Sequence, residues 1–296
     1  MMETVKAYAK INLHLDVCGI LDDGYHSVKT VMQSVSLFDD VTVELDDNGT
    51  FFAECNVDGV PTDEKNIAVR AAKLYVERIG EKCGARIKID KNIPMAAGLA
   101  GGSADAAAAL IALNRIFDER LAAEELFELG AMLGADVPFC IACGTLYSDG
   151  KGEKLHSFPQ MKQDVIFAIA CGGEGVSTPW GYRLLDEKFD RFSNYSPKDT
   201  NELEVSLKCG ASNAFCKNLF NVFEAPILEH RPVAKEIKEL FANKGAICAL
   251  MSGSGPSVYA VFENENDALV AIDAIKQKGY FAAIARPISA RFAIYS

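Results

Sequence analysis

The chain has 296 residues, 49% of them hydrophobic and 24% charged, with 30 Lys and Arg against 41 Asp and Glu. A net charge of −11 argues against a broad nucleic-acid-binding face. No apolar run approaches the roughly 20 residues of a transmembrane helix, and the N-terminus lacks a signal-peptide core. We therefore expect a cytoplasmic monomer or homodimer with small-molecule partners, and neither nucleic acid nor membrane among them.

The cysteines indicate a reducing compartment. Nine of them run from Cys18 to Cys248, and an odd number cannot all pair within the chain. Cys140 and Cys143 form a C-x-x-C with no second Cys or His pair at zinc spacing, in an apolar stretch that follows a proline. We expect both to be small buried apolar side chains, and the sequence offers no metal-ligand cluster.

Length and a change of character near residue 155 predict two domains, 1–155 and 156–296. The turn residues 46–49 (Asp-Asp-Asn-Gly) predict a hairpin between two of the first strands. In the first domain, we expect strands at 5–17, 41–45, 51–55, 85–89 and 139–147 and helices at 66–79, 104–117 and 122–133.

The second domain has a similar mixture of helices and strands. Residues 189–209 are polar and weakly patterned, which predicts a loop or a short helix followed by a mobile stretch. Elsewhere, we expect strands at 165–170, 246–251, 258–262 and 280–285 and helices at 220–228, 233–244 and 268–278.

A glycine- and alanine-rich loop before the helix at 104–117 is the strongest local signal. Small side chains let backbone N–H groups face one concavity, and the helix adds its free N–H groups and positive dipole end. We expect Ser103 to be the N-cap. Such a loop suits a di- or triphosphate. The predicted phosphate loop consists of Pro94, Met95, Ala96, Ala97, Gly98, Leu99, Ala100, Gly101, Gly102, Ser103 and Ala104.

Taken alone, the same segment is also compatible with a plain serine-capped loop before a core helix. It is not the common P-loop, because no Gly-Lys-Ser/Thr follows the glycines. It is not a dinucleotide fingerprint, which would need G-x-G-x-x-G and an acid about 20 residues later.

Four segments together resemble the GHMP kinase family. A proline followed by G-L-x-G-G-S-x-D-A-A resembles its nucleotide loop, and Ala7–Leu13 resembles its A-x-A-K-I-N-L opening. Residues 133–139 and the glycine loop at 251–258 match two further family segments in order and spacing. The resemblance implies an ATP-dependent small-molecule kinase of α+β class. Its N-terminal domain would be similar to ribosomal-protein S5 domain 2, its C-terminal domain would be ferredoxin-like, and the ligands would meet between them.

Asp23-Gly24-Tyr25-His26, directly after the first strand, narrows the choice within the family. This motif resembles that of a member which phosphorylates the 2-hydroxyl of a substrate carrying a cytidine diphosphate group, in isoprenoid precursor biosynthesis. A cytosine ring needs an aromatic face and polar groups at its edge, and Tyr25 and His26 offer both. Taken alone, a Tyr-His pair in a turn is more often structural.

The resemblance also implies the catalytic groups. Asp136 matches the family's catalytic aspartate, which would accept the hydroxyl proton, and Lys10 matches the lysine that keeps this aspartate ionised. In isolation, Asp136 would be read as a turn residue and Lys10 as a solvated charge. The cofactors implied are ATP and Mg²⁺. Sister families have a serine pair where this chain has Gly101-Gly102, so the metal ligands stay open.

On the substrate side, the resemblance implies Asn12 in the opening motif, and Tyr182 is a second aromatic candidate at the cytosine. Trp180 is its rival, and burial is as plausible for either side chain. Two other functions compete with the proposed one. The first is another GHMP kinase, such as a homoserine or mevalonate kinase, and Asp23–His26 argues against it. The second is a non-catalytic nucleotide- or sugar-binding relative, against which the joint presence of Lys10 and Asp136 argues.

Overall fold

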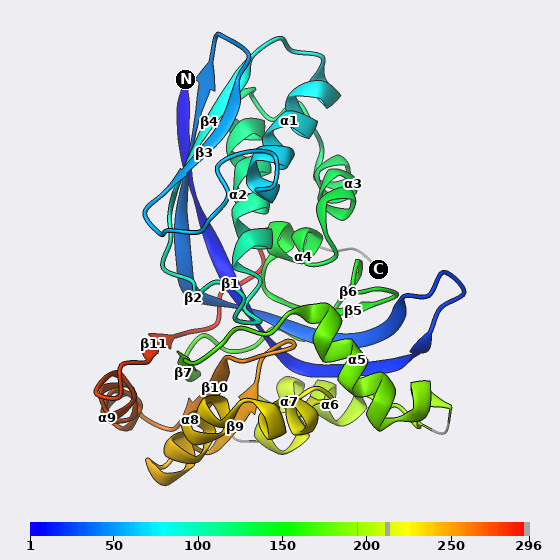
Figure 1. Cartoon of the computed structure of the whole chain (residues 1–296), viewed down its shortest axis with the longest axis vertical. Coiled ribbons are helices and arrows are strands. Elements are labelled where there is room, and N and C mark those ends of the chain that lie inside the picture. The colour runs from blue at the N-terminus through cyan, green and yellow to red at the C-terminus, as the bar shows by residue number, and fades with distance from the viewer. Residues whose placement is uncertain (194, 211–213, 293–296) are drawn as a thin grey trace.

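Two β-sheets form the frame of the protein, and helices pack against each of them (Figure 1). The computed structural model describes residues 1–193, 195–210 and 214–292. The predicted α+β class is confirmed. The larger sheet has the order β3-β4-β2-β1-β8, with β5 paired to β2 and β6 paired to β5. Its strands are β1 (Met2–Ile20), β2 (His26–Asp46), β3 (Phe51–Cys55), β4 (Gly84–Asp90), β5 (Thr145–Asp149), β6 (Lys154–Ser157) and β8 (Phe220–Asn221).

The predicted hairpin at residues 46–49 is wrong. The turn forms, because the Asp46 carboxylate accepts hydrogen bonds from Asn48 and Thr50. However, β3 pairs with β4 in parallel, and β4 lies between β3 and β2. The residue before β3 lies against the start of β4, and only a glycine fits there. A Cβ on Gly84 would lie 2.0 Å from the Thr50 carbonyl oxygen. A turn signal fixes the reversal of the chain but not the strand next to which it returns.

Four helices cover one side of the upper part of the larger sheet (Figure 1). The Asn66 side chain caps the first of them, and Gly80 ends it in the left-handed conformation, with a φ of 71°. The prediction of a strand at 139–147 is wrong in its first half. Residues 137–142 form a short helix that begins with Val137-Pro138, where a proline suits a first turn. These helices are α1 (Ile67–Ile79), α2 (Gly101–Ile116), α3 (Ala123–Leu133) and α4 (Val137–Ala142).

The smaller sheet is antiparallel, with the order β11-β7-β10-β9. Two helices, α8 and α9, pack their apolar sides on one of its faces. The predicted helix at 220–228 is only partly right, because Phe220-Asn221 pairs with β1 instead. The weakly patterned stretch contains a helix at its end. These elements are β7 (Ile166–Cys171), α5 (Thr178–Lys188), α6 (Asn201–Cys209), α7 (Glu224–His230), α8 (Pro232–Asn243), β9 (Cys248–Met251), β10 (Val258–Phe262), α9 (Glu265–Lys276) and β11 (Phe281–Ala285).

One apolar cluster joins the two sheets. Ile11 and Val31 from the larger sheet pack in the same cluster as Phe167 and Tyr259 from the smaller one, and all four side chains are fully buried. The Tyr259 hydroxyl also donates to the backbone carbonyl of Asn12 at 3.0 Å. The domain boundary near residue 155 stays a prediction.

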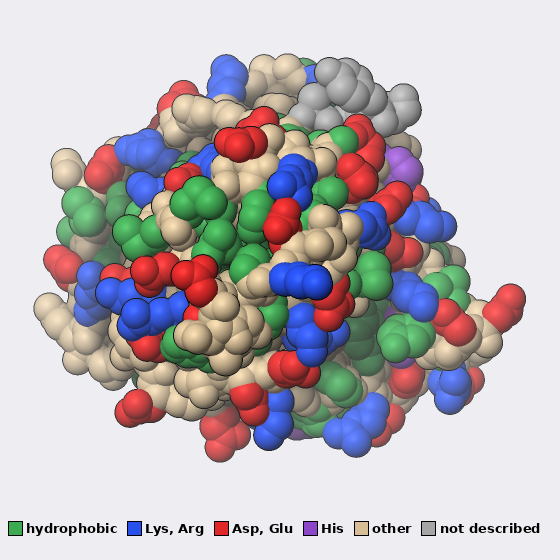
Figure 2. All heavy atoms as spheres, turned by 90° about the horizontal axis from the view of Figure 1, so that it is seen from above, with side chains coloured by type: hydrophobic (Ala, Val, Ile, Leu, Met, Phe, Trp, Pro, Cys, Tyr) green, Lys and Arg blue, Asp and Glu red, His purple; other side chains and the backbone are tan. Residues whose placement is uncertain are grey.

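On the face seen from above, acidic and basic side chains are intermingled rather than segregated by sign (Figure 2). Within the described part of the chain, no helix is both long enough and apolar enough to cross a membrane. Cys140 and Cys143 are buried in and just after α4, where they pack as small apolar side chains.

Candidate functional site

A cavity of about 500 Å³ opens beside the phosphate loop. Its walls come from β1, β2, the loop before α2, the start of α4, α5 and the glycine loop after β9. Of the residues predicted to form the site, most line this one space. They are Lys10, Asn12, Pro94, Met95, Ala96, Ala97, Gly98, Leu99, Ala100, Gly101, Gly102, Ser103, Asp136 and Tyr182. Ala104 is buried behind them.

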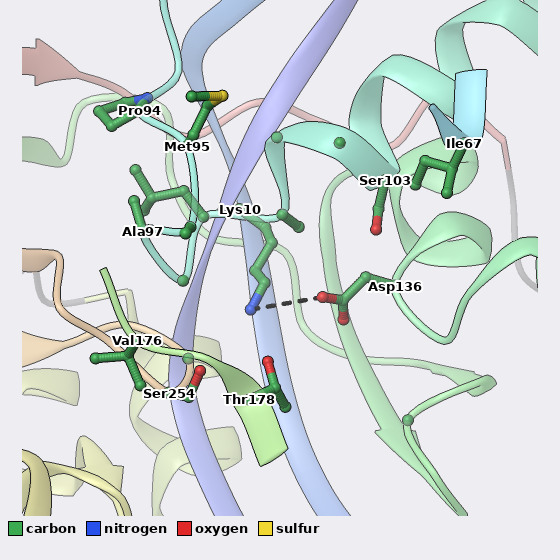
Figure 3. A pocket seen from close by; sticks show the side chains of 18 of the residues that line it. Lys10, Ile67, Pro94, Met95, Ala97, Ser103, Asp136, Val176, Thr178 and Ser254 are labelled. Carbon is green, nitrogen blue, oxygen red and sulfur yellow. Dashed lines mark ion pairs between the residues drawn. The ribbon is translucent and has the colours of Figure 1, made fainter. Parts of the chain in front are cut away.

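The phosphate loop meets α2 one turn earlier than expected. The helix begins at Gly101, after Ala100 in the left-handed conformation with a φ of 57°. Ser103 therefore lies inside the first turn and is not the N-cap, which corrects the prediction. Helix formation from Gly101 onward leaves the free backbone N–H groups of residues 101–103 at the cavity wall. The Ser103 hydroxyl is thereby left available to the cavity (Figure 3).

The phosphate loop packs directly against the second glycine loop. Gly98 has a φ of +78°, and a Cβ there would lie 2.2 Å from the Ser252 carbonyl oxygen. The Ser252 hydroxyl donates to the Gly98 carbonyl at 3.0 Å, and the Ser257 N–H donates to the Ala97 carbonyl at 3.1 Å. Gly253 and Ser254 then reach the cavity. The two loops form one wall.

Lys10 and Asp136 face each other across the cavity (Figure 3). The distance from Lys10 Nζ to Asp136 Oδ2 is 3.9 Å, and the side chains are 6% and 38% exposed. The lysine is therefore enclosed, while the carboxylate stays accessible to a ligand. The backbone of Lys10 also contacts the phosphate loop, because the Lys10 N–H donates to the Leu99 carbonyl at 3.1 Å.

Asn12 connects these groups. Its Oδ1 accepts hydrogen bonds from Lys10 Nζ at 2.7 Å and from the Gly253 N–H at 2.9 Å, and its Nδ2 donates to Thr30 Oγ1 at 2.8 Å. Because its Oδ1 accepts from both groups, Asn12 fixes the Lys10 ammonium relative to the second glycine loop. A buried amide with three hydrogen bonds favours one geometry.

A buried ion cluster supports the phosphate loop from below, and the sequence had not pointed to it. Lys91 Nζ lies 2.6 Å from Asp39 Oδ2 and 2.8 Å from Asp105 Oδ2. Asp39 Oδ1 also accepts from the backbone N–H groups of Asn92 and Ile93. Lys91 and Asp105 both line the cavity. The cluster ties β2 to the residues just before the loop and to the first turns of α2.

Asp105 has one carboxylate oxygen without a hydrogen-bond partner, Oδ1, and this atom is buried. Burial raises the pKa of Asp105 to about 7, even though the Lys91 ammonium opposes the shift, and Asp39 adds to it. An unpartnered buried oxygen is costly unless a ligand, a water or a proton satisfies it.

Two further lysines, Lys65 and Lys151, line the cavity and were missed by the sequence analysis. Lys151 Nζ forms an ion pair with Asp23 Oδ2 at 2.6 Å and lies 4.1 Å from the centre of the Tyr25 ring. Lysines in surface turns are common, so nothing in their local sequence marked them. In total, lysines outnumber carboxylates by four to two along the cavity.

Besides the buried Ala104, Tyr25 and His26 are the predicted site residues that do not line the cavity. Tyr25 is 62% exposed, on the turn between β1 and β2. His26 stacks on Tyr182, with ring centroids 4.3 Å apart and planes at 23°. Burial raises the pKa of Tyr182 to about 12, and nearby Asp136 contributes. Trp180 lies outside the lining, with the Arg231 guanidinium over its ring.

The described residues contain no group of three or more His, Cys, Asp or Glu side chains placed to hold a metal ion. Ser103, Asp105 and Asp136, whose side chains carry oxygen atoms, nevertheless line the cavity. Oxygen ligands of this kind suit Mg²⁺ that arrives with phosphates and keeps several waters, rather than a cage made by the protein alone.

Two family models match the chain. GHMP kinases N terminal domain matches residues 66–144, which include the phosphate loop and Asp136, and GHMP kinases C terminal matches residues 207–280, which include the second glycine loop. Both stretches contribute to the cavity.

Three relatives illustrate the similarity over more than nine-tenths of the chain. A 4-diphosphocytidyl-2-C-methyl-D-erythritol kinase from Caldicellulosiruptor saccharolyticus is 43% identical over 276 residues, which cover 92% of each chain. The crystal structure of a 4-(cytidine 5'-diphospho)-2C-methyl-D-erythritol kinase, 31% identical, superposes with a TM-score of 0.79 over 96% of this chain and 98% of that one. A homoserine kinase from Cytophaga hutchinsonii, 18% identical, has a TM-score of 0.73 over 98% and 95% of the two chains, which shows a shared fold.

Proposed function

Because this chain belongs to the 4-diphosphocytidyl-2-C-methyl-D-erythritol kinases of the GHMP kinase family, we propose that it transfers the γ-phosphoryl group of ATP to the 2-hydroxyl of that substrate. The products are the 2-phosphate and ADP, in the non-mevalonate route to isoprenoid precursors. The observation that carries the proposal is the 43% identity over 92% of the chain. The family and fold predicted from the motifs are confirmed.

The charge of the cavity supports a polyanionic ligand. On a chain with a net charge of −11, lysines predominate at this one wall. Lys91 is already neutralised by Asp39 and Asp105, and Lys151 is paired with Asp23. The charge available to a ligand therefore comes first from Lys10 and Lys65, and from Lys151 once it leaves Asp23. Together with the backbone N–H groups at the start of α2, these cations suit the phosphates of ATP and the diphosphate of the second substrate.

Asp136 and Lys10 are assigned the chemical step. Asp136 accepts the proton of the substrate hydroxyl while the hydroxyl oxygen attacks the γ-phosphorus of ATP. The bond between the γ-phosphorus and the oxygen that bridges it to the β-phosphate then breaks, and ADP leaves. Lys10, 3.9 Å away, stabilises the ionised carboxylate and the negative charge that develops on the transferred group. Asn12 holds Lys10 in place through the 2.7 Å hydrogen bond from its ammonium.

The residues present fit a magnesium ion bound together with ATP. Mg²⁺ supplies neutralisation of the β- and γ-phosphate charge. The Ser103 hydroxyl and the Asp105 carboxylate, with its unpartnered buried Oδ1, are the groups that would hold it. Asp136 is not assigned to the metal ion, because its carboxylate accepts the proton of the substrate hydroxyl.

We assign the cytosine ring to the end of the cavity at Tyr182. Tyr182 provides an aromatic face there, and the turn that carries Tyr25 and His26 lies beside it. Since Tyr25 is exposed and Lys151 covers its ring, Tyr25 would have to release that lysine before it stacks on a base. We further propose that the protein is cytoplasmic and works as a monomer or homodimer, with neither nucleic acid nor membrane as a partner.

The test is a kinase assay with ATP and Mg²⁺ on three alcohols: the cytidylated methylerythritol, homoserine and mevalonate. We expect kcat/KM for the cytidylated substrate to exceed that for either control by about 100-fold or more, as when a site hydrogen-bonds a group that its rivals lack. Comparable turnover of homoserine or mevalonate would favour a sister kinase. ATP binding with no turnover of any alcohol would favour a non-catalytic relative.

A further inference from the structure

His26, the first residue of β2, is held by two residues of α5. Its Nε2 lies 2.7 Å from Asp186 Oδ1, and its ring stacks on Tyr182 at 4.3 Å. Tyr182 and Asp186 are four residues apart and therefore share one side of the helix. Phe192 adds an edge-on contact at 5.9 Å. The imidazole is thus enclosed, with its side chain 13% exposed.

The chemistry of this contact fixes which ring nitrogen carries hydrogen. An ionised carboxylate only accepts hydrogen bonds, so His26 Nε2 is the donor to Asp186. In the neutral imidazole, the lone pair is then on Nδ1. Among the described residues, Nδ1 of His26 has no hydrogen-bond partner. A carboxylate that fixes the tautomer of a histidine in this way also fixes the plane of its ring.

We propose that Asp186 is a positioning residue for recognition of the substrate's base. It holds His26 as the Nε2–H tautomer, flat against Tyr182, so that Nδ1 is left as an acceptor on a ring that stacks on a residue lining the cavity. The inference rests on the proposed function, since it takes the cytidine end of the substrate to bind at Tyr182.

Such an acceptor distinguishes between pyrimidines. Cytosine presents an amino group at its C4 edge, which donates to a lone pair, whereas uracil presents a carbonyl oxygen at the same position. The lone pair of Nδ1 suits the amino group and repels the carbonyl. Without Asp186, the imidazole can take the other tautomer, which would turn Nδ1 from an acceptor into a donor.

The experiment measures binding of cytidine diphosphate and uridine diphosphate by calorimetry to the parent protein and to Asp186→Asn. Asparagine keeps the shape but can donate to Nε2 as well as accept from it. We expect the preference for cytidine diphosphate to fall by about 10-fold, within the range of one base-specific hydrogen bond, while the Kd for ADP changes less than about 2-fold. Glu187→Gln, an equal charge change on an exposed residue of the same helix, is the matched control.

A double-mutant cycle with His26→Ala tests whether Asp186 acts through His26. In the His26→Ala background, Asp186→Asn should leave the preference unchanged, because the group that it positions is gone. A full additional loss in that background, or an unchanged preference in the well-folded single variant, would overturn the proposal.

The tautomer itself is measured by ¹⁵N chemical shifts of the imidazole, with no ligand present. We expect the Nε2–H form in the parent protein and a shift toward Nδ1–H in Asp186→Asn. If His26 of the parent protein carried its hydrogen on Nδ1, the proposal would be refuted, whatever the binding measurements gave. If the parent bound neither diphosphate, the proposed function would fail, and the ¹⁵N measurement would still decide the role of Asp186.

Discussion

Two kinds of charged residue meet at the cavity. Lys10 and Asp136 face the ligand space, and the separation of 3.9 Å leaves Asp136 free to take a proton. Lys91 and Asp105 touch the cavity but are tied to each other and to Asp39, so they are part of its support. Substitution of Asp136 should therefore affect catalysis, whereas substitution of Asp105 should affect stability.

Asp136→Asn should lower kcat by about 10²–10⁴-fold, because the amide cannot accept the hydroxyl proton. ATP affinity should stay within about 3-fold, measured by calorimetry. Asp136 is partly exposed, so the loss of its ion pair with Lys10 should cost little stability. Asp58→Asn, on an exposed loop, is the control. A variant with more than half of the parent kcat would contradict the assignment.

Asp105→Asn should change how stability depends on pH. Burial raises the pKa of Asp105 to about 7, so between about pH 4 and pH 7 the folded protein keeps a proton that the unfolded chain has lost. The parent protein therefore loses free energy of unfolding as pH rises through that window. Asparagine does not titrate and removes this loss.

We expect the variant to gain at least about 1 kcal/mol relative to the parent between pH 5 and pH 8, measured by urea unfolding. The free energy of unfolding of Asp58→Asn should change with pH in the same way as that of the parent over the same range. If the curves for the parent and Asp105→Asn were parallel as well, the buried carboxyl would have an ordinary pKa.

Among the elements, the two glycine loops and the start of α2 decide the shape of the cavity. The presence and type of the helix at α2 could be predicted, because its alanine-rich sequence has a strong local propensity. Its first residue could not, since the helix begins after Ala100 in the left-handed conformation, which an alanine rarely adopts. The same holds for Gly98, whose partner Ser252 is distant in sequence.

Gly98→Ala should lower Tm by about 4 °C or more, because alanine is strained at a φ of +78° and its Cβ would collide with the Ser252 carbonyl. ATP binding should weaken as the two loops separate. Gly102→Ala is the matched control, since its Cβ would meet only Ile67 Cδ1 at 3.8 Å. Its Tm should be equal to that of the parent or higher. Equal losses in both variants would contradict the docking of the loops.

Across the whole molecule, local patterns indicated most elements but not how the sheets are assembled. Strands 51–55 and 258–262 were found with their observed bounds, since both are short and end at clear turns. The place of β4 between β2 and β3, and the pairing of β8 with β1, depend on segments far apart in the chain. Periodicity carries no information about such neighbours. Likewise, the site motifs were found, while Lys91, Lys151 and Asp186 act through distant partners.

Since one apolar cluster spans both sheets, we expect the chain to unfold in one step. The single tryptophan, Trp180, is in α5 and reports on that region, while far-UV circular dichroism reports on all helices and strands. Both signals should give the same Tm within about 1 °C, and ATP with Mg²⁺ should raise both together. Two separate midpoints would show that the two sheets unfold independently.

The contrast between an acidic chain and a lysine-lined cavity also affects how fast a ligand arrives. An approaching nucleotide with several negative charges first meets the repulsive field of the whole protein, and it meets the lysines only at short range. The repulsion acts over longer distances than the attraction, so dissolved salt screens it first. Modest ionic strength should therefore speed up encounter, and only higher ionic strength should weaken the bound complex.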